Sequence, residues 1–166
     1  SILVFKLLGK PDPRTRFSKN PGVTNVYRQA GWFLAALVLV LDMGRAAAVA
    51  LLSQHFLAPS LVLWVAAGLI LGNRYPCFHG FSGGKGVANY LGFHTALMPL
   101  AGGLAVLAYG AVFAICRIPF IASFALLAVL AASAIAQWGH LHAALAAIIV
   151  TVGLIVWFHR GNIAEL

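Results

Sequence analysis

The sequence predicts an all-α fold: a polytopic integral membrane helix bundle of about seven transmembrane or half-transmembrane helices. Hydrophobic residues make up 62% of the 166 positions and charged residues only 8%, whereas soluble domains are about 45–50% apolar and about 25% charged. The apolar residues gather in runs, and a helix needs about 20 such residues to cross the hydrocarbon core. The basic residues fall between these runs on one side, as expected for the cytoplasmic loops of membrane proteins.

The apolar runs define the expected elements in chain order. Residues 2–8 resemble the end of a helix whose beginning is missing, so we expect a truncated first span. Residues 31–53 form a full span that contains Asp42 and Arg45, and residues 60–71 form a shorter one. The remaining runs are residues 87–115, 120–136 and 142–158. Together they predict one membrane-embedded domain over residues 1–166.

The run 87–115 is too long for one ordinary span. As a single span it would place Arg117 and Arg160 on the side opposite to the other basic loops, against the positive-inside rule. A break near Pro99, which lacks a backbone donor, gives a short re-entering helix followed by a full one. Ten of the eleven basic residues then lie at one face, which we expect to be cytoplasmic, and only Arg45 lies inside a helix.

The net charge of +8 is compatible with nucleic-acid binding, because basic domains often bind phosphate backbones. No long basic stripe with interleaved aromatic residues occurs, however, so we expect no nucleic-acid partner. Cys77 and Cys116 show no metal-ligand spacing and are expected to be unpaired.

The first polar segment, residues 17–28, directly precedes a predicted span. Pro21 suits the first helical position after an Asn20 cap, and Thr24 and Arg28 share one helix face at i, i+4 spacing. A helix N-terminus beside Ser, Asn and Arg side chains is suited to anions. An equally weighted alternative is a capped loop whose basic residues only fix orientation.

The second segment, residues 80–86, opens the short helix and contains four glycines and Lys85. Glycines allow backbone N–H groups to converge on an anion, and Lys85 adds a positive charge. A flexible turn is the weaker alternative. The segment is not a Walker A loop, because His79 stands where that motif has glycine and Gly86 where it has Ser or Thr. We therefore expect no nucleotide.

The third segment, residues 157–163, ends the last span on the same face as the other two. His159 and Arg160 there complement the helix dipole, which alone would explain them. Their convergence with the two other polar segments favours a shared site.

Acidic residues are scarce, with only Asp12, Asp42 and Glu165 in the chain. Paired-carboxylate hydrolysis, carboxylate-rich metal sites and a Ser-His-Asp triad are therefore not expected. We expect Asp42 to pair with Arg45 as a structural ion pair inside the membrane. A site of cations, amides and hydroxyls without a base suits two phosphate-bearing molecules, with the base supplied by a substrate.

Taken together, the three segments resemble the PlsY family of acylphosphate:glycerol-3-phosphate acyltransferases of bacterial membranes. The family signatures match Ser18, Asn20, Gly22, Thr24, Asn25 and Arg28 in the first segment, residues 83–88 in the second and residues 159–163 in the third. Asp42 and Arg45 resemble the family's Asp-x-x-Lys. The chain departs from the family pattern at Lys19, Asn73 and Ser82, where Gly, His and Lys are usual.

The resemblance implies transfer of a fatty acyl group from acyl phosphate to the 1-hydroxyl of glycerol 3-phosphate. The product is lysophosphatidic acid, in the first step of bacterial phospholipid synthesis, at the cytoplasmic face of the inner membrane. It also implies a substrate-assisted mechanism without metal, cofactor or acyl-enzyme. The implied catalytic residues are Ser18, Arg28, Lys85, His159 and Asn162, and the implied binding residues are Asn20, Thr24, Asn25, Gly83, Gly84 and Gly86.

Two alternatives remain at this point. A non-catalytic relative that binds lipid phosphate would keep the same segments, and the three departures could be its marks. An anion transporter would also collect Arg, Lys and glycine, but it should place them near the bilayer midplane and often shows inverted repeats.

Overall fold

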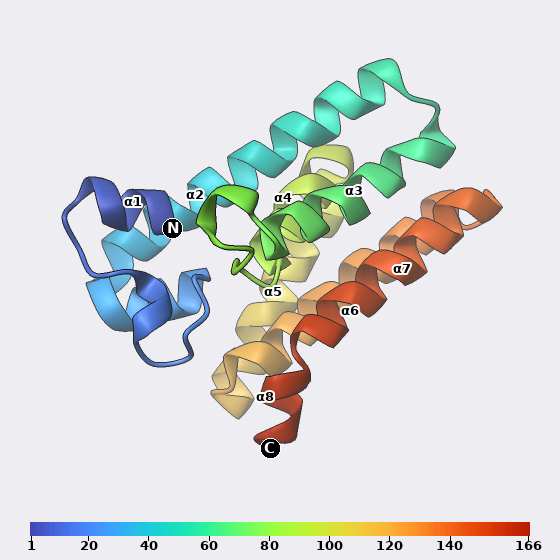
Figure 1. Ribbon diagram of the computed structural model, residues 1–166. Coiled ribbons are helices and arrows are strands. Elements are labelled where there is room, and N and C mark those ends of the chain that lie inside the picture. The colour runs from blue at the N-terminus through green and yellow to red at the C-terminus, as the bar shows by residue number, and fades with distance from the viewer.

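The computed structural model describes residues 1–166 as a bundle of helices without strands (Figure 1). The elements in chain order are α1 (Ile2–Leu7), η1 (Pro13–Thr15), α2 (Val23–Phe56), α3 (Pro59–Arg74), η2 (Cys77–His79), α4 (Val87–Leu97), α5 (Pro99–Cys116), α6 (Pro119–Trp138), α7 (His142–Phe158) and α8 (Arg160–Ala164). The predicted all-α class is confirmed, as are the six predicted elements from residue 31 onward.

Proline marks the beginning of three of the long helices. Pro59, Pro99 and Pro119 open α3, α5 and α6, where a missing N–H costs little because the first turn has no intrahelical acceptor for it. Pro99 also separates α4 from α5, which confirms the predicted break in the run 87–115. With 11 residues, α4 is about 16 Å long and therefore too short to cross a bilayer.

The beginning of α2 differs from the prediction. Its N-cap is Gly22, so the expectation that Asn20 caps a helix opened by Pro21 is wrong. The Asn20 side chain instead folds against Gly22, where an added Cβ would lie 2.8 Å from its Nδ2. Gly31, at φ 80° and ψ 179°, then interrupts α2 in a conformation that glycine adopts readily. The first turns of α2 are thereby set off from the long membrane-spanning part.

Small residues allow the helices to pack closely. Contacts are most extensive between α2 and α4, α5 and α6, and α3 and α7. A Cβ added at Gly92 of α4 would lie 2.5 Å from the Cα of Met43 on α2, so these two helices touch through their backbones. Ala46 and Ala50 of α2 are fully buried in the same core. Such close approach through small residues is typical of membrane helices.

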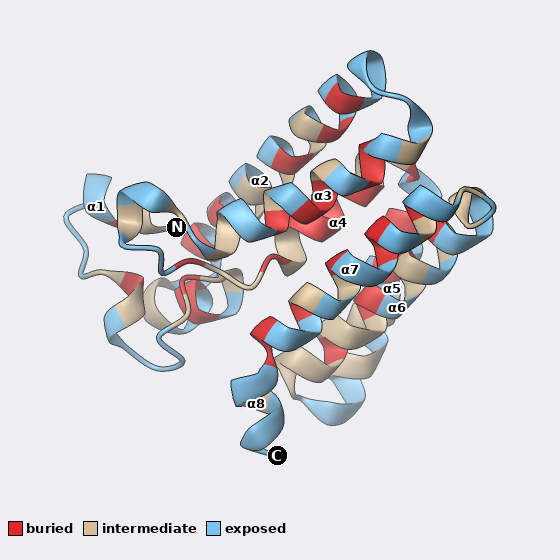
Figure 2. Cartoon of the chain, turned by 45° about the vertical axis from the view of Figure 1, so that its right-hand side comes forward, coloured by how far each residue is buried: buried red, intermediate tan, exposed pale blue.

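The outer faces of the long helices are apolar, as an integral membrane protein requires. Four helical segments are long and apolar enough to cross a membrane, within Val23–Phe56, Pro59–His79, Pro99–Cys116 and Pro119–Trp138, and α7 is a shorter apolar helix. Many large hydrophobic side chains, such as Leu107 and Ile149, are exposed on the bundle, and exposed bands run along the helices in Figure 2. We therefore describe the chain as an integral membrane protein.

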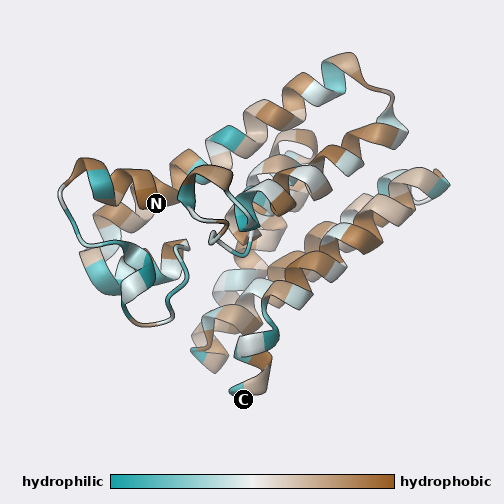
Figure 3. Ribbon diagram, in the orientation of Figure 1, coloured by the Kyte–Doolittle hydropathy of each residue, from teal (hydrophilic) through white to brown (hydrophobic).

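Polar residues gather at one end of the bundle. Figure 3 shows hydrophilic segments around η1, in the loop before α4 and at the start of α8. The connections from α2 to α3 and from α6 to α7 lie at the opposite end (Figure 1), and neither contains Lys or Arg. This arrangement agrees with the sidedness predicted from charge, and it brings the three polar segments to one end.

Candidate functional site

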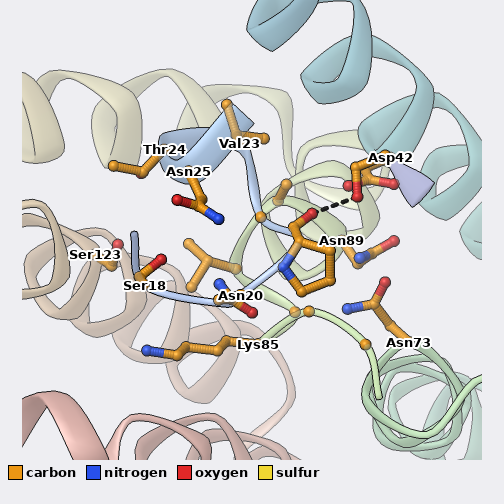
Figure 4. A pocket seen from close by; sticks show the side chains of 18 of the residues that line it. Ser18, Asn20, Val23, Thr24, Asn25, Asp42, Asn73, Lys85, Asn89 and Ser123 are labelled. Atoms are coloured by element: carbon orange, nitrogen blue, oxygen red, sulfur yellow. Dashed lines mark hydrogen bonds between the residues drawn. The ribbon is translucent and has the colours of Figure 1, made fainter. Parts of the chain in front are cut away.

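A large cavity of about 1080 Å³ lies among the three polar segments. Figure 4 shows side chains of the first two segments, such as Ser18 and Lys85, around it. All eleven residues predicted for the site line it: Ser18, Asn20, Thr24, Asn25, Arg28, Gly83, Gly84, Lys85, Gly86, His159 and Asn162. The fold therefore confirms that segments far apart in sequence converge. The role of each residue stays a prediction.

The first segment places its side chains from a loop and the first turns of α2. Thr24 and Arg28, one turn apart, and Ser18 are exposed within the cavity wall. Asn25 differs, because it is only 2% exposed and its Nδ2 donates to the carbonyls of Pro13, at 2.9 Å, and Arg16, at 3.3 Å. Asn25 thus holds the preceding loop in place, and only its Oδ1 lacks a protein partner.

Two glycines of the second segment are required by packing. A Cβ at Gly83 would lie 2.0 Å from the carbonyl oxygen of Asn73, and one at Gly86 would lie 2.7 Å from Cδ1 of Ile70. Gly86 also has φ +91° and is the N-cap of α4. The loop therefore lies directly on the end of α3, and its glycines fix the position of Lys85 as well as exposing backbone N–H groups.

Lys85 projects from this loop toward the third segment. Its Nζ donates to Oδ1 of Asn162, a residue of α8. Burial lowers the pKa of the Lys85 ammonium, and the nearby positive charge of Arg74 lowers it further. An amide oxygen orients the ammonium without neutralising it, so Lys85 can still attract an anion.

His159 lies between α7 and α8 and is 4% exposed. Its Nδ1 lies 2.8 Å from the carbonyl oxygen of Ile155, and since a carbonyl only accepts, Nδ1 carries a proton. The ring also packs edge-on against Phe124, with centroids 5.3 Å apart. Burial is the main cause that lowers the His159 pKa, and the charge of Lys85 adds to it. The neutral imidazole therefore offers an unprotonated Nε2.

The charge of the cavity wall favours anions. Four cationic side chains line it, Lys19, Arg28, Arg45 and Lys85, against two carboxylates, Asp42 and Glu165. No cluster of three or more metal-ligating side chains occurs in the chain. Cations, amides and hydroxyls in one cavity can bind phosphate groups and stabilise a developing oxyanion.

The predicted ion pair between Asp42 and Arg45 is wrong. The only ion pair within 4 Å in the protein joins Asp12 to Arg14. Arg45 Nη2 instead donates to Oδ1 of Asn89 at 2.7 Å and to Oδ1 of Asn73 at 3.1 Å. Sequence spacing within α2 could not show that α3 and α4 present two amide oxygens to the guanidinium.

Three lining residues were missed from the sequence: Asn89, Tyr109 and Ser123. Asn73, one of the three departures from the family pattern, also borders the cavity. Ser123 lies one turn into α6, and its hydroxyl donates to the carbonyl of Pro119 at 2.9 Å, which leaves the oxygen free to accept. A polar residue near the end of an apolar helix was the available signal.

Comparisons with known proteins agree with this geometry. The family model described as glycerol-3-phosphate acyltransferase matches residues 1–166. A glycerol-3-phosphate acyltransferase of Methylobacillus flagellatus is 43% identical over 175 residues, covering 99% of this chain and 84% of that protein. One of Azotobacter vinelandii is 40% identical over 167 residues, covering 100% of this chain and 87% of that protein.

Two solved structures share the fold. The crystal structure of PlsY (YgiH), an integral membrane glycerol 3-phosphate acyltransferase, in its glycerol 3-phosphate form, matches with a TM-score of 0.88 and 30% identity over 98% of this chain and 82% of that one. Its lysophosphatidic acid form matches with a TM-score of 0.85 and 29% identity, over 98% of this chain and 81% of that one.

Proposed function

Because the chain belongs to the glycerol-3-phosphate acyltransferase family, we propose that it transfers a fatty acyl group from an acyl phosphate to the 1-hydroxyl of glycerol 3-phosphate. The hydroxyl oxygen attacks the carbonyl carbon and forms the ester bond of lysophosphatidic acid. The bond between the carbonyl carbon and the phosphate oxygen breaks, and inorganic phosphate leaves.

One observation carries the proposal: three segments of the chain converge on a single cavity that combines cations with neutral donors. Two phosphate-bearing substrates require such a site, because each phosphate needs charge-assisted hydrogen bonds. In the proposed complex Arg28 and Lys85 bind phosphate, the backbone of residues 83–86 adds N–H donors, and Ser18 and Asn162 orient the reacting groups. Asn20 and Thr24 shape the cavity beside them.

The proton of the hydroxyl goes to the phosphate of the acyl donor in the proposed mechanism. Asp42 and Glu165 line the cavity, but neither forms an ion pair with Lys85 or Arg28, so both cations remain able to bind phosphate. His159 in its neutral form accepts a hydrogen bond at Nε2 and can orient the attacking hydroxyl. The departing phosphate then carries the proton away, and no metal, cofactor or acyl-enzyme takes part.

The cavity lies at the end of the bundle that carries most Lys and Arg, so we propose that it faces the cytoplasm of a bacterial inner membrane. Apolar residues such as Leu39, Val106 and Phe120 also line it. They are suited to the first carbons of a fatty acyl chain that extends into the surrounding lipid. Membrane lipids are thus the expected environment, and no nucleic acid or nucleotide is expected as a partner.

The test is acceptor-dependent release of phosphate. Purified protein in lipid is mixed with an acyl phosphate, with and without glycerol 3-phosphate, and inorganic phosphate and lysophosphatidic acid are measured. We expect both products only when the acceptor is present, and neither from Lys85→Ala. Well-folded protein that binds glycerol 3-phosphate but forms no product would contradict the proposal and favour a non-catalytic binding relative.

A further inference from the structure

An ion pair outside the cavity connects the two loops that form its walls. Asp12 accepts from Arg14 at both carboxylate oxygens, with Nε at 3.0 Å from each and Nη2 at 2.6 Å. The remaining arm of the guanidinium, Nη1, donates to the carbonyls of His79 at 2.6 Å and Ser82 at 3.2 Å. One side chain from the loop that carries Ser18 thus binds the backbone of the loop that carries Lys85.

The Arg14 end of this connection is itself anchored. Pro13, next to Arg14, is buried, and its carbonyl accepts from Nδ2 of Asn25 at 2.9 Å and from Nε2 of Gln29 at 2.7 Å. Asn25 and Gln29 lie one turn apart on α2. The first loop is therefore attached to the beginning of α2, and Arg14 extends that attachment across to residues 79–82.

The other end is held by a second arginine. The backbone carbonyl of Arg74, at the end of α3, accepts from the Gly83 N–H at 2.9 Å. The side chain of Arg74 donates from Nη1 to the carbonyl of Gly83 at 3.1 Å. Arg14 and Arg74 therefore bind consecutive parts of one loop, from different elements. Lys85 follows two residues after Gly83, so its backbone position depends on both.

We infer that Arg14, held by Asp12, is a positioning residue that fixes the spacing between the Ser18 loop and the Lys85 loop across the cavity. A partly exposed ion pair such as this one contributes little to stability by itself. The difference here lies in the planar guanidinium, which bonds the carboxylate through Nε and Nη2 and two carbonyls through Nη1. A lysine ammonium carries all its donors on one nitrogen and does not impose this fixed geometry. The inference deepens the proposed function, on which its kinetic test rests.

Kinetic measurements distinguish an Arg14 that positions the two loops from an Arg14 that only forms an ion pair with Asp12. We expect Arg14→Ala to lower kcat/KM for glycerol 3-phosphate by about 10- to 100-fold, since displacement of a positioned group by about 1 Å can cost about 100-fold. Arg14→Lys keeps the charge and should recover only a small part of this loss. Arg16→Ala is the matched control, because Arg16 lies in the same loop and its exposed side chain makes no hydrogen bond. Full activity of Arg14→Lys would overturn the inference.

A distance measurement tests the same inference without substrate. Cys77 is exposed on the second loop and Lys10 on the first. In a protein that carries Lys10→Cys and Cys116→Ser, spin labels are attached to the cysteines at positions 10 and 77. We expect a narrow distance distribution with Arg14, a broadened or shifted one with Arg14→Ala and with Arg14→Lys, and a narrow one with Arg16→Ala. An unchanged distribution in both Arg14 variants would overturn the inference, whatever the acyl donor proves to be.

Discussion

Replacement of Gly83 by alanine should damage the site through a single steric contact. A Cβ at this position would lie 2.0 Å from the carbonyl oxygen of Asn73 and 2.8 Å from Cδ of Pro76. Ordinary carbon–oxygen contacts begin at about 3.3 Å, so the loop must move away from α3 by more than about 1 Å. Because Lys85 follows in the same loop, we expect Gly83→Ala to lower kcat/KM by about 100-fold.

Two other glycines provide graded controls for this prediction. At Gly84 an added Cβ would lie 3.1 Å from Nδ2 of Asn73, a side chain that can turn aside, and at Gly161 nothing lies within 4 Å. We therefore expect a loss of less than tenfold for Gly84→Ala, consistent with about 1 kcal/mol, and no change for Gly161→Ala. The assay is acyl transfer in lipid, with thermal unfolding to confirm folding. Equal activities of the Gly83 and Gly161 variants would refute the steric reasoning.

Three further predictions concern charge, packing and pH. Lys85→Met should lower kcat by about 100-fold or more, since it removes a cation from a partly buried site; activity near that of the wild type would contradict the proposed role. Gly92→Ala should lower the free energy of unfolding in detergent by about 1–3 kcal/mol through contact with Met43, whereas Gly103→Ala, with open space around it, should not. Burial lowers the pKa of His159, so below pH about 6.5 the unfolded chain binds more protons than the folded one. The free energy of unfolding should therefore fall as the pH decreases. His159→Gln should reduce this difference in stability between pH 7 and pH 5.

The overall fold could be predicted because its signals are local. Pro99 breaks the run 87–115 through its own missing donor and ring, and the distribution of Lys and Arg selects the broken form over the unbroken one. Helix ends at the other runs follow from composition in the same way. None of these inferences requires knowledge of which helix neighbours which.

The details of the site depended on tertiary contacts that spacing does not reveal. Asn20 and Pro21 fit a capping pattern, yet the side chain of Asn20 lies against Gly22, and α2 begins at Val23. Arg45 lies one turn from Asp42, yet it bonds amide oxygens contributed by α3 and α4. For Arg45, partners distant in sequence replaced the local one that the pattern suggested, whereas for Asn20 a different local conformation moved the helix start to Val23.

The partners of the cavity's cations offer a physical reason for the scarcity of acidic residues. Lys85 bonds the amide oxygen of Asn162, and Arg45 bonds those of Asn73 and Asn89. Neutral oxygens orient these cations without forming an ion pair with them, whereas a carboxylate partner would compete directly with a phosphate group. The only carboxylate in an ion pair, Asp12, holds Arg14 outside the cavity.

Because neutral amide oxygens hold the cavity's cations, introducing a carboxylate beside one of them should weaken phosphate binding without removing any cation. Asn162→Asp places a carboxylate beside Lys85 with almost unchanged volume, so the new ion pair should compete with the substrate phosphates. We expect KM for glycerol 3-phosphate to rise by about tenfold or more, while Asn162→Ala, which leaves the ammonium free, should affect KM less. Titration of glycerol 3-phosphate at fixed acyl phosphate measures both. A lower KM in the aspartate variant than in the alanine variant would contradict the view that neutral partners keep the cavity cationic.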